Sequence, residues 1–134
     1  MRVGLLIVAH RHIGSEVLAT ASRTLGICPL QTESLEVFNE DERNELLERA
    51  GALITELDQG AGVLILSDAY GSTPSNVAVA ASVDRHCRVV TGLNLPMLLR
   101  VFNYPGRSLE ELAESAAAGG RSGIILVGEG APPR

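Results

Sequence analysis

The stretch VGLLIVAH, residues 3–10, is the most informative part of the chain about its fold, because seven residues without a polar side chain lead directly into a histidine. A continuous apolar run of this length is typical of a parallel β-strand that is buried on both faces. The stretch GVLILS, residues 62–67, repeats the pattern and leads into Asp68. Two such strands predict a mostly parallel sheet with any ligand at the carboxyl ends of its strands.

Segments with the helical spacing of apolar residues alternate with strands along the rest of the chain. Two further strands are expected, an edge strand within residues 30–37 and a short strand at residues 88–91. The expected helices cover residues 16–25, 39–58, 75–82, 96–102 and 108–118. This alternation predicts a single-domain, doubly wound α/β fold with helices on both faces of the sheet.

Small polar residues mark the expected starts of two helices. Asn39 or Asp41 is expected to cap the second helix, because both side chains accept hydrogen bonds from free backbone N–H groups. Ser75 or Asn76 is expected to start the third helix, after a Gly71-Ser72-Thr73-Pro74 loop. That loop again follows a predicted strand, so it lies at the same edge of the sheet as Asp68.

The C-terminal part of the chain contains one more apolar run. Gly119-Gly120 is expected to end the last helix and to act as a hinge, since glycine interrupts helices. Residues 123–127 are then expected to form a final strand. We expect residues 1–128 to form the domain and residues 129–134, which contain two prolines, to be a flexible tail.

The composition excludes several classes of function. The 134 residues are enough for one buried core and too few for two domains. The chain contains no lysine, and its net charge is -5. These facts exclude a P-loop lysine, Schiff-base catalysis and a broad basic surface for nucleic acid. An aromatic content of 3% also leaves no ladder of rings for base stacking, so we expect no nucleic-acid partner.

Two features favour a cytoplasmic protein. Cys28 and Cys87 lie far apart in the sequence and form no C-x-x-C motif, so they are expected to be free thiols in a reducing compartment. The apolar run at residues 3–9 is too short to span a membrane, and no signal-peptide cleavage pattern follows it.

His10 and Asp68 form a candidate reactive pair, because the carboxyl ends of adjacent parallel strands meet at one edge of a sheet. A carboxylate that accepts a hydrogen bond from one ring nitrogen fixes the tautomer of the imidazole. The other nitrogen is then unprotonated and can attack an electrophile. A histidine that merely caps a strand end would look the same in sequence, so the two residues alone leave both interpretations open.

Two neighbouring segments favour an anionic ligand. The turn after His10 leads into a helix start near residues 13–15, where free N–H groups and the helix dipole can hold a phosphoryl group. The Gly71-Ser72-Thr73-Pro74 loop offers further amide and hydroxyl donors. Each segment alone could be an ordinary strand-to-helix turn. Together with the His10 and Asp68 pair they indicate a phosphate site.

Three motifs in the same order carry a resemblance to a known family. They are LLIVAH at residues 5–10, LILSDAYGSTPSN at residues 64–76 and GLNLPMLL at residues 92–99. The chain resembles the IIA component of the mannose family of the phosphoenolpyruvate-dependent sugar phosphotransferase system, over essentially its whole length. The resemblance implies that residues 1–128 are this IIA domain and that His10 becomes phosphorylated. It also implies that Asp68 hydrogen-bonds the ring and that Thr73 helps to bind phosphate.

The resemblance implies a phosphotransferase that relays a phosphoryl group between histidines. HPr would be the donor and a IIB domain or protein the acceptor, in sugar uptake or in regulation, with contact to membranes only through other components. Such transfer depends on positioning and charge stabilisation, so we expect no cofactor and no metal ion. The resemblance further implies a homodimer in which residues 123–127 are exchanged and pair antiparallel with the partner's sheet.

The chain departs from the family pattern at two places in the site. Arg11 and His12 follow His10 where the family usually has a glycine directly after its histidine, and Arg11 either grips phosphate or points to solvent. The loop reads Gly-Ser-Thr-Pro in place of Gly-Gly-Ser-Pro, so the contribution of Gly71, Ser72 and Thr73 to phosphate binding stays open. Since the chain ends soon after the last predicted strand, we expect a free-standing IIA protein.

Three alternative functions compete with this interpretation. A dihydroxyacetone kinase relay subunit would use the same site with another acceptor. A metal-dependent hydrolase would use His10, His12 and Asp68, but further ligands are missing, since His86 is the only other histidine. A receiver domain would need an acidic pair after the first strand and a lysine after the last, and the chain has neither.

Overall fold

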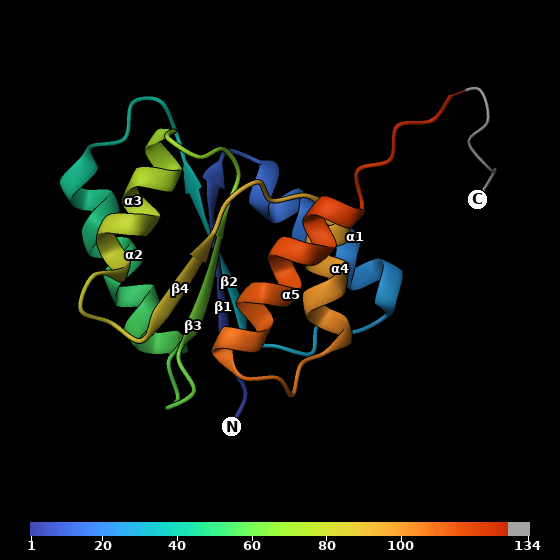
Figure 1. The fold of residues 1–134 in the computed structure, drawn as a ribbon. Coiled ribbons are helices and arrows are strands. Elements are labelled where there is room, and N and C mark those ends of the chain that lie inside the picture. Colours follow the sequence, from blue (N-terminus) through green and yellow to red (C-terminus); the bar gives the residue numbers. More distant parts are fainter. Residues whose placement is uncertain (129–134) are drawn as a thin grey trace.

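The structure, a computed structural model, describes residues 1–128, and the predicted tail at residues 129–134 lies outside the described residues. Its elements form three layers, with a sheet between two layers of helices (Figure 1). In chain order they are β1 Gly4–His10, α1 Ile13–Leu25, β2 Thr32–Val37, α2 Arg43–Leu57, β3 Val63–Ser67, α3 Thr73–Ser82, β4 Cys87–Val90, α4 Leu95–Asn103 and α5 Leu109–Ser122.

The sheet has the strand order β2-β1-β3-β4, and all three strand pairs are parallel. This confirms the predicted α/β fold and the edge position of β2. The central strand β1 is paired on both sides, and its first six residues are buried. A strand in that position has no polar face, which is why residues 3–9 form a continuous apolar run.

The two faces of the sheet carry separate cores. Leu5 and Ile7 of β1 pack with α1, α4 and α5, whereas Leu6 and Val8 pack with α2 and α3. Each such fully buried side chain stabilises the fold by about 1.5–3 kcal/mol relative to exposure. His10 continues the alternation of Leu6 and Val8, so it belongs to the face that α2 and α3 cover.

The structure corrects two predicted helix starts. Neither Asn39 nor Asp41 caps α2, because the Glu42 side chain accepts the Asn44 N–H, while the Asp41 side chain accepts the Phe38 N–H within the loop. The third helix starts at Thr73 and not at Ser75 or Asn76.

Ser72 caps this helix through its side chain. Pro74 suits the first turn, where its missing N–H has no helical partner to lose. The helix α3 therefore begins inside the predicted phosphate loop.

The prediction that Gly119-Gly120 ends the last helix is wrong, since α5 continues to Ser122. These glycines pack against α4. A Cβ atom at Gly119 would lie 2.5 Å from the Cβ of Arg100, and one at Gly120 would lie 2.9 Å from the terminal carbon of Met97. The glycines are there because the two helices approach closely, and not because the helix stops.

The predicted final strand at residues 123–127 is not formed: within the described chain, no strand follows α5. Because α5 runs on through Gly119-Gly120, the chain does not turn back towards its own sheet and extends away from it (Figure 1). Ile124 and Leu126 are 74% and 95% exposed. Exchange of this segment needs a second chain and stays a prediction.

The close approach of α4 and α5 makes Gly119 sensitive to substitution. We expect Gly119→Ala to lower the free energy of unfolding by about 1–3 kcal/mol, because the added methyl group overpacks the contact with Arg100. Equilibrium urea denaturation measures this change. The matched control is Gly106→Ala, where a Cβ would meet open space, and we expect a change within about 0.5 kcal/mol. A Gly119→Ala variant stabilised by the helix propensity of alanine would contradict the packing argument.

Candidate functional site

The sheet topology brings the candidate residues to one place. The chain leaves β1 for α1 on one face of the sheet and leaves β3 for α3 on the other face. Parallel sheets bind ligands where neighbouring strands diverge in this way, just beyond their carboxyl ends. His10 is the last residue of β1, and Asp68 directly follows β3. Both predicted residues therefore lie at the switch point of the sheet.

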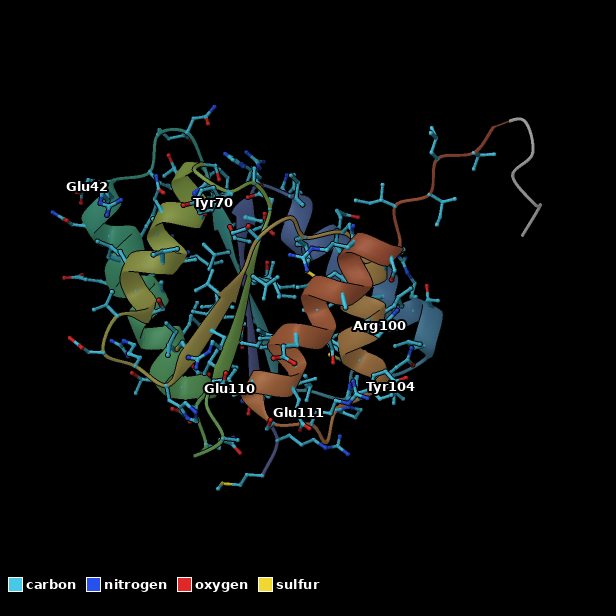
Figure 2. The ribbon with its side chains drawn as sticks, viewed as in Figure 1. Glu42, Tyr70, Arg100, Tyr104, Glu110 and Glu111 are labelled. Carbon is cyan, nitrogen blue, oxygen red and sulfur yellow. The ribbon has the colours of Figure 1, made fainter. Side chains whose placement is uncertain are left out.

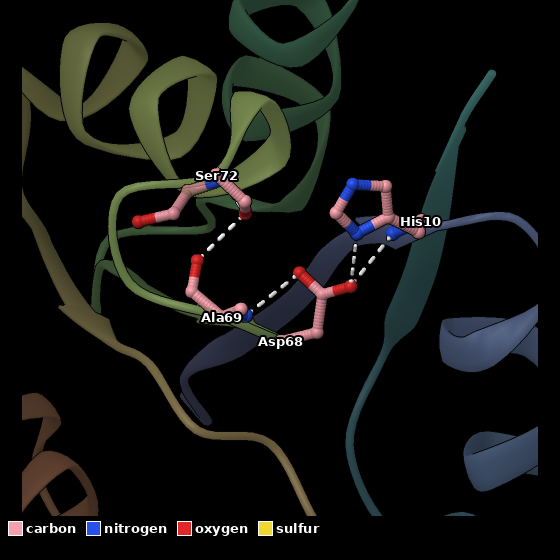
Figure 3. Close-up of polar contacts among 5 residues, drawn as sticks. His10, Asp68, Ala69 and Ser72 are labelled. Carbon is pink, nitrogen blue, oxygen red and sulfur yellow. Dashed lines mark hydrogen bonds and ion pairs between the residues drawn. The ribbon is translucent and has the colours of Figure 1, made fainter. Parts of the chain in front are cut away.

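The Asp68 carboxylate holds His10 through two hydrogen bonds (Figure 3). Its Oδ2 atom accepts from the His10 backbone N–H at 3.0 Å and contacts the ring Nδ1 at 2.7 Å. Its Oδ1 atom accepts from the Ala69 N–H at 2.9 Å. An ionised carboxylate only accepts, so Nδ1 carries the proton and Nε2 carries a free lone pair.

Burial and hydrogen bonding act on Asp68 in opposite directions. Burial raises the pKa of this carboxyl, but the hydrogen bonds from His10 and the Ala69 amide outweigh it, and the pKa lies below the usual value. The group is therefore ionised at neutral pH. The Asp68 side chain is 10% exposed, whereas that of His10 is 43% exposed, so the histidine remains reachable from solvent.

The loop that carries Asp68 is fixed from two sides. Gly71 has a φ of +86°, a conformation that favours glycine. The Ser72 hydroxyl donates to the Ala69 carbonyl at 2.6 Å and accepts from the Ser75 N–H at 3.5 Å. Of the predicted phosphate ligands, Ser72 is therefore engaged within the loop, whereas Thr73 is exposed in the first turn of α3.

The loop after β4 also supports the site, which the sequence did not reveal. The Gly92 N–H donates to the Asp68 carbonyl at 2.8 Å, and the Leu93 N–H donates to the Ser67 carbonyl at 3.0 Å. These bonds hold the backbone on both sides of the Asp68 side chain. The motif around residue 92 thus contributes to the site through its backbone.

One of the N–H groups at the predicted phosphate-binding start of α1 has a partner within the protein. The Ser15 N–H already donates to the Glu36 side chain at 3.1 Å. Glu36 reaches this point because β2 pairs with β1 so that Glu36 lies beside Ala9. A carboxylate from the neighbouring strand thus occupies the positive end of the helix dipole. In the sequence, Glu36 is only one residue of the expected edge strand within residues 30–37.

Arg11 lies against its neighbours beside the histidine. Its Nε donates to His12 Nε2 at 2.8 Å, and its Cζ atom lies 4.7 Å from the centre of the Phe38 ring. A cavity of about 370 Å³, called here the His10 pocket, opens at this place. The residues that line it are His10, Arg11, Val37, Phe38, Asn39 and Glu40. No pattern in the sequence had marked Phe38 as a neighbour of His10 and Arg11.

The metal-dependent alternative finds no support in the geometry. Among residues 1–128, no three His, Cys, Asp or Glu side chains come together as metal ligands. The Nε2 atom of His12 accepts from Arg11, and His86 lies at the amino end of β4, away from the site.

The described part of the chain also has no helix that is both long enough and apolar enough to cross a membrane.

Solved structures share this fold. The mannose/sorbose-specific IIA subunit of the phosphotransferase system from Enterococcus faecalis superposes with a TM-score of 0.84 at 26% identity, over 99% of this chain and 100% of the other. The PTS IIA protein associated with the fucose utilization operon of Streptococcus pneumoniae gives a TM-score of 0.78 at 24% identity, over 94% and 93% of the two chains.

Sequence comparison gives the same assignment. The PTS system mannose-specific EIIAB component of Escherichia coli (strain K12) is 30% identical over 130 residues, which cover 92% of this chain and 39% of that protein. The chain thus spans well under half the length of this relative. A family model named EIIA-man, described as PTS system fructose IIA component, matches residues 4–117. The chain therefore belongs to the mannose family of IIA components of the phosphoenolpyruvate-dependent sugar phosphotransferase system.

Proposed function

We propose that this protein is a phosphohistidine carrier of the phosphotransferase system. His10 accepts a phosphoryl group from phosphorylated HPr and passes it to a IIB domain or protein, in sugar uptake or in regulation. The observation that carries this proposal is the 2.7 Å contact between Asp68 Oδ2 and His10 Nδ1, because it leaves Nε2 as a nucleophile. Family membership supplies the reaction class, and the pair supplies the reacting atom.

The transfer follows from the tautomer of His10. The Nε2 lone pair forms a bond to phosphorus while the bond between phosphorus and the donor histidine nitrogen breaks, and that electron pair returns to the donor ring. The proton on Nδ1 stays in place, so the His10 ring becomes positively charged. Asp68 stabilises this charge at close range, since its low pKa keeps it ionised. No cofactor takes part, because both reacting groups are ring nitrogens.

The phosphoryl group also needs donors for its oxygens. We assign this role to Gly71 and Thr73 at the start of α3 and to Arg11 in the His10 pocket. Ser72 contributes mainly by fixing the loop, because its hydroxyl bonds to the Ala69 carbonyl. Helix N-termini favour anions through their free N–H groups and dipole, and α3 is ten residues long.

We further propose that two chains form a homodimer in the cytoplasm. Four consecutive apolar residues, 124–127, are exposed in the single chain, by 53% to 95%. The strand β4 forms one edge of the sheet, and beside it lies a groove of about 400 Å³ lined in part by Val89, Met97 and Ala117. A segment from a partner would cover that edge and bury apolar surface on both chains.

The carrier function predicts one covalent phosphoryl group on His10. After incubation with phosphoenolpyruvate, enzyme I and HPr, the intact mass of the wild type should rise by one phosphoryl group, and that of His10→Ala should not change. Alkaline quenching preserves the acid-labile bond. No addition to the wild type in the presence of phosphorylated HPr would refute the proposal. An adduct that persists in His10→Ala would move the site to His12 or His86.

Asp68 is expected to control the rate of transfer. In Asp68→Asn, the side-chain amide can donate to Nδ1, which shifts the proton to Nε2 and removes the nucleophilic lone pair. We expect phosphorylation by HPr to slow by at least about a hundredfold. Rapid-quench kinetics measures the rate, and circular dichroism confirms that the variant is folded. A rate within a few-fold of the wild type would show that Asp68 only caps the strand.

The exposed apolar segment predicts the oligomeric state. Sedimentation velocity at tens of micromolar should give a dimer for the wild type and a monomer for Leu126→Asp, because the charge opposes burial of the segment. The matched control is Val83→Asp, which changes another exposed apolar side chain, on the α3 to β4 connection. A monomeric wild type, or a dimer that survives Leu126→Asp, would contradict this part of the proposal.

A further inference from the structure

The Arg11 side chain is held at two points, which leaves its outer end free. Its Nε donates to His12 Nε2 at 2.8 Å, and its planar group lies over the Phe38 ring with Cζ 4.7 Å from the centre. A guanidinium has five N–H donors, and these two contacts use one of them and one face. The four N–H groups on the two terminal nitrogens form the fork that suits phosphate oxygens.

The root of this side chain is fixed to the sheet. The Arg11 N–H donates to the Val37 carbonyl at 3.0 Å, which extends the pairing of β1 with β2 by one residue. Val37 and Phe38 are consecutive, so the same segment that anchors the Arg11 backbone also supplies the ring. Arg11 and His10 both line the His10 pocket. Backbone and side chain are thus both oriented before any ligand arrives.

Negative charges lie around the His10 pocket, so a bound phosphoryl group needs a cation nearby. Asp68 contacts the His10 ring, and Glu40 lines the same pocket. A phosphoryl group adds about -1.5 to -2 charges at neutral pH. Among the residues that line the pocket, Arg11 is the one with a permanent positive charge. Without it, the added charge would face two carboxylates and one helix end.

We propose that Phe38 and His12 are positioning residues that aim the terminal nitrogens of Arg11 at the phosphoryl group on His10 Nε2, and that this contact sets the equilibrium between phosphorylated and free protein. The inference rests on the proposed carrier function. A surface arginine loses rotamer freedom when it binds an anion, and the two contacts remove much of that freedom in advance. The bond being transferred is unchanged, so the effect is on the phosphorylated state.

The chain contains a matched control for this arrangement. Arg107 lies over the Tyr104 ring with its Cζ atom 3.8 Å from the centre. Tyr104 follows α4, far from Tyr70 in the loop that carries Asp68 (Figure 2). Removing the Tyr104 ring therefore breaks the same kind of contact without touching the His10 pocket.

The experiment compares the wild type with Arg11→Gln, Phe38→Leu, the double variant, Phe38→Tyr and Tyr104→Leu. Each protein is equilibrated with a fixed ratio of phosphorylated to free HPr, and intact mass gives the ratio of phosphorylated to free protein. The 31P chemical shift of the phosphohistidine is recorded on the same samples. Thermal unfolding shows that each variant is folded, and Phe38→Tyr keeps an aromatic face if Phe38→Leu does not fold.

We expect Arg11→Gln to lower the equilibrium ratio about tenfold, since one charge-assisted hydrogen-bond pair to phosphate is lost. Phe38→Leu should lower it several-fold and add little in the Arg11→Gln background, because it acts through Arg11. Phe38→Tyr and Tyr104→Leu should have the same equilibrium ratio as the wild type. The 31P chemical shift should change only in Arg11→Gln, Phe38→Leu and the double variant.

Two results would overturn the inference. The first is that Arg11→Gln leaves both the ratio of phosphorylated to free protein and the 31P shift unchanged. The second is that Phe38→Leu lowers the ratio in the Arg11→Gln background as much as it does in the wild type. A wild type that takes up no phosphoryl group would instead refute the carrier function itself, so the two failures are distinguishable. If the wild type is phosphorylated on His10 but Arg11→Gln leaves the equilibrium ratio unchanged, the carrier function is supported and only the role of Arg11 is refuted.

Discussion

The parallel pairing of β1 with β3 is the constraint on which the site depends. Val8 lies opposite Ser67 in this pair, so β1 continues for two residues beyond the end of β3. His10 at the end of β1 and Asp68 directly after β3 then lie side by side, close enough for the carboxylate to bind both the backbone and the ring of the histidine. A shift of the register by one residue would turn the His10 side chain to the other face of the sheet and break both bonds. The apolar side chains of the strands, which fill two separate cores, hold this register in place.

The two faces of the sheet serve different ends. On the side of α2 and α3, His10 contacts the Asp68 carboxylate, and α3 begins in the loop that follows Asp68. On the other side, α4 and α5 approach closely through Gly119 and Gly120, which makes a compact support behind the loop that follows β4. That loop donates backbone hydrogen bonds to the carbonyl groups of Ser67 and Asp68. The packing of α4 and α5 on one face therefore helps to position His10 and Asp68 through the backbone. Positioning of this kind suits phosphoryl transfer, which needs correct placement more than strong covalent chemistry.

The distribution of charge around His10 differs from that of a site that only binds anions, because carboxylates lie near the cation. Glu36 lies at the start of α1, Asp68 contacts the His10 ring and Glu40 lines the His10 pocket, so the cation Arg11 lies among carboxylates. Carboxylates near the site stabilise a positively charged ring, and they also make retention of the phosphoryl group less favourable. A carrier must release the group as readily as it accepts it, and a balance between these charges fits that requirement.

The layout of the fold and the positions of His10 and Asp68 could be predicted from the sequence alone. Continuous apolar runs report burial on both faces, which is a local property, and so the strands, their parallel pairing and the positions of His10 and Asp68 at their ends followed from it. The three-dimensional structure was needed to show that α5 continues through Gly119-Gly120, that Glu36 accepts a hydrogen bond at the start of α1, and that Arg11 lies over the Phe38 ring. Each of these features depends on a contact between two elements, and no local sequence pattern encodes such a contact. A glycine pair, for example, predicts the end of a helix unless a neighbouring helix is known to pack closely against it. For the same reason residues 123–127 have the pattern of a strand but no partner within the described chain, since an apolar pattern gives the tendency to pair and only the surrounding surface gives the partner.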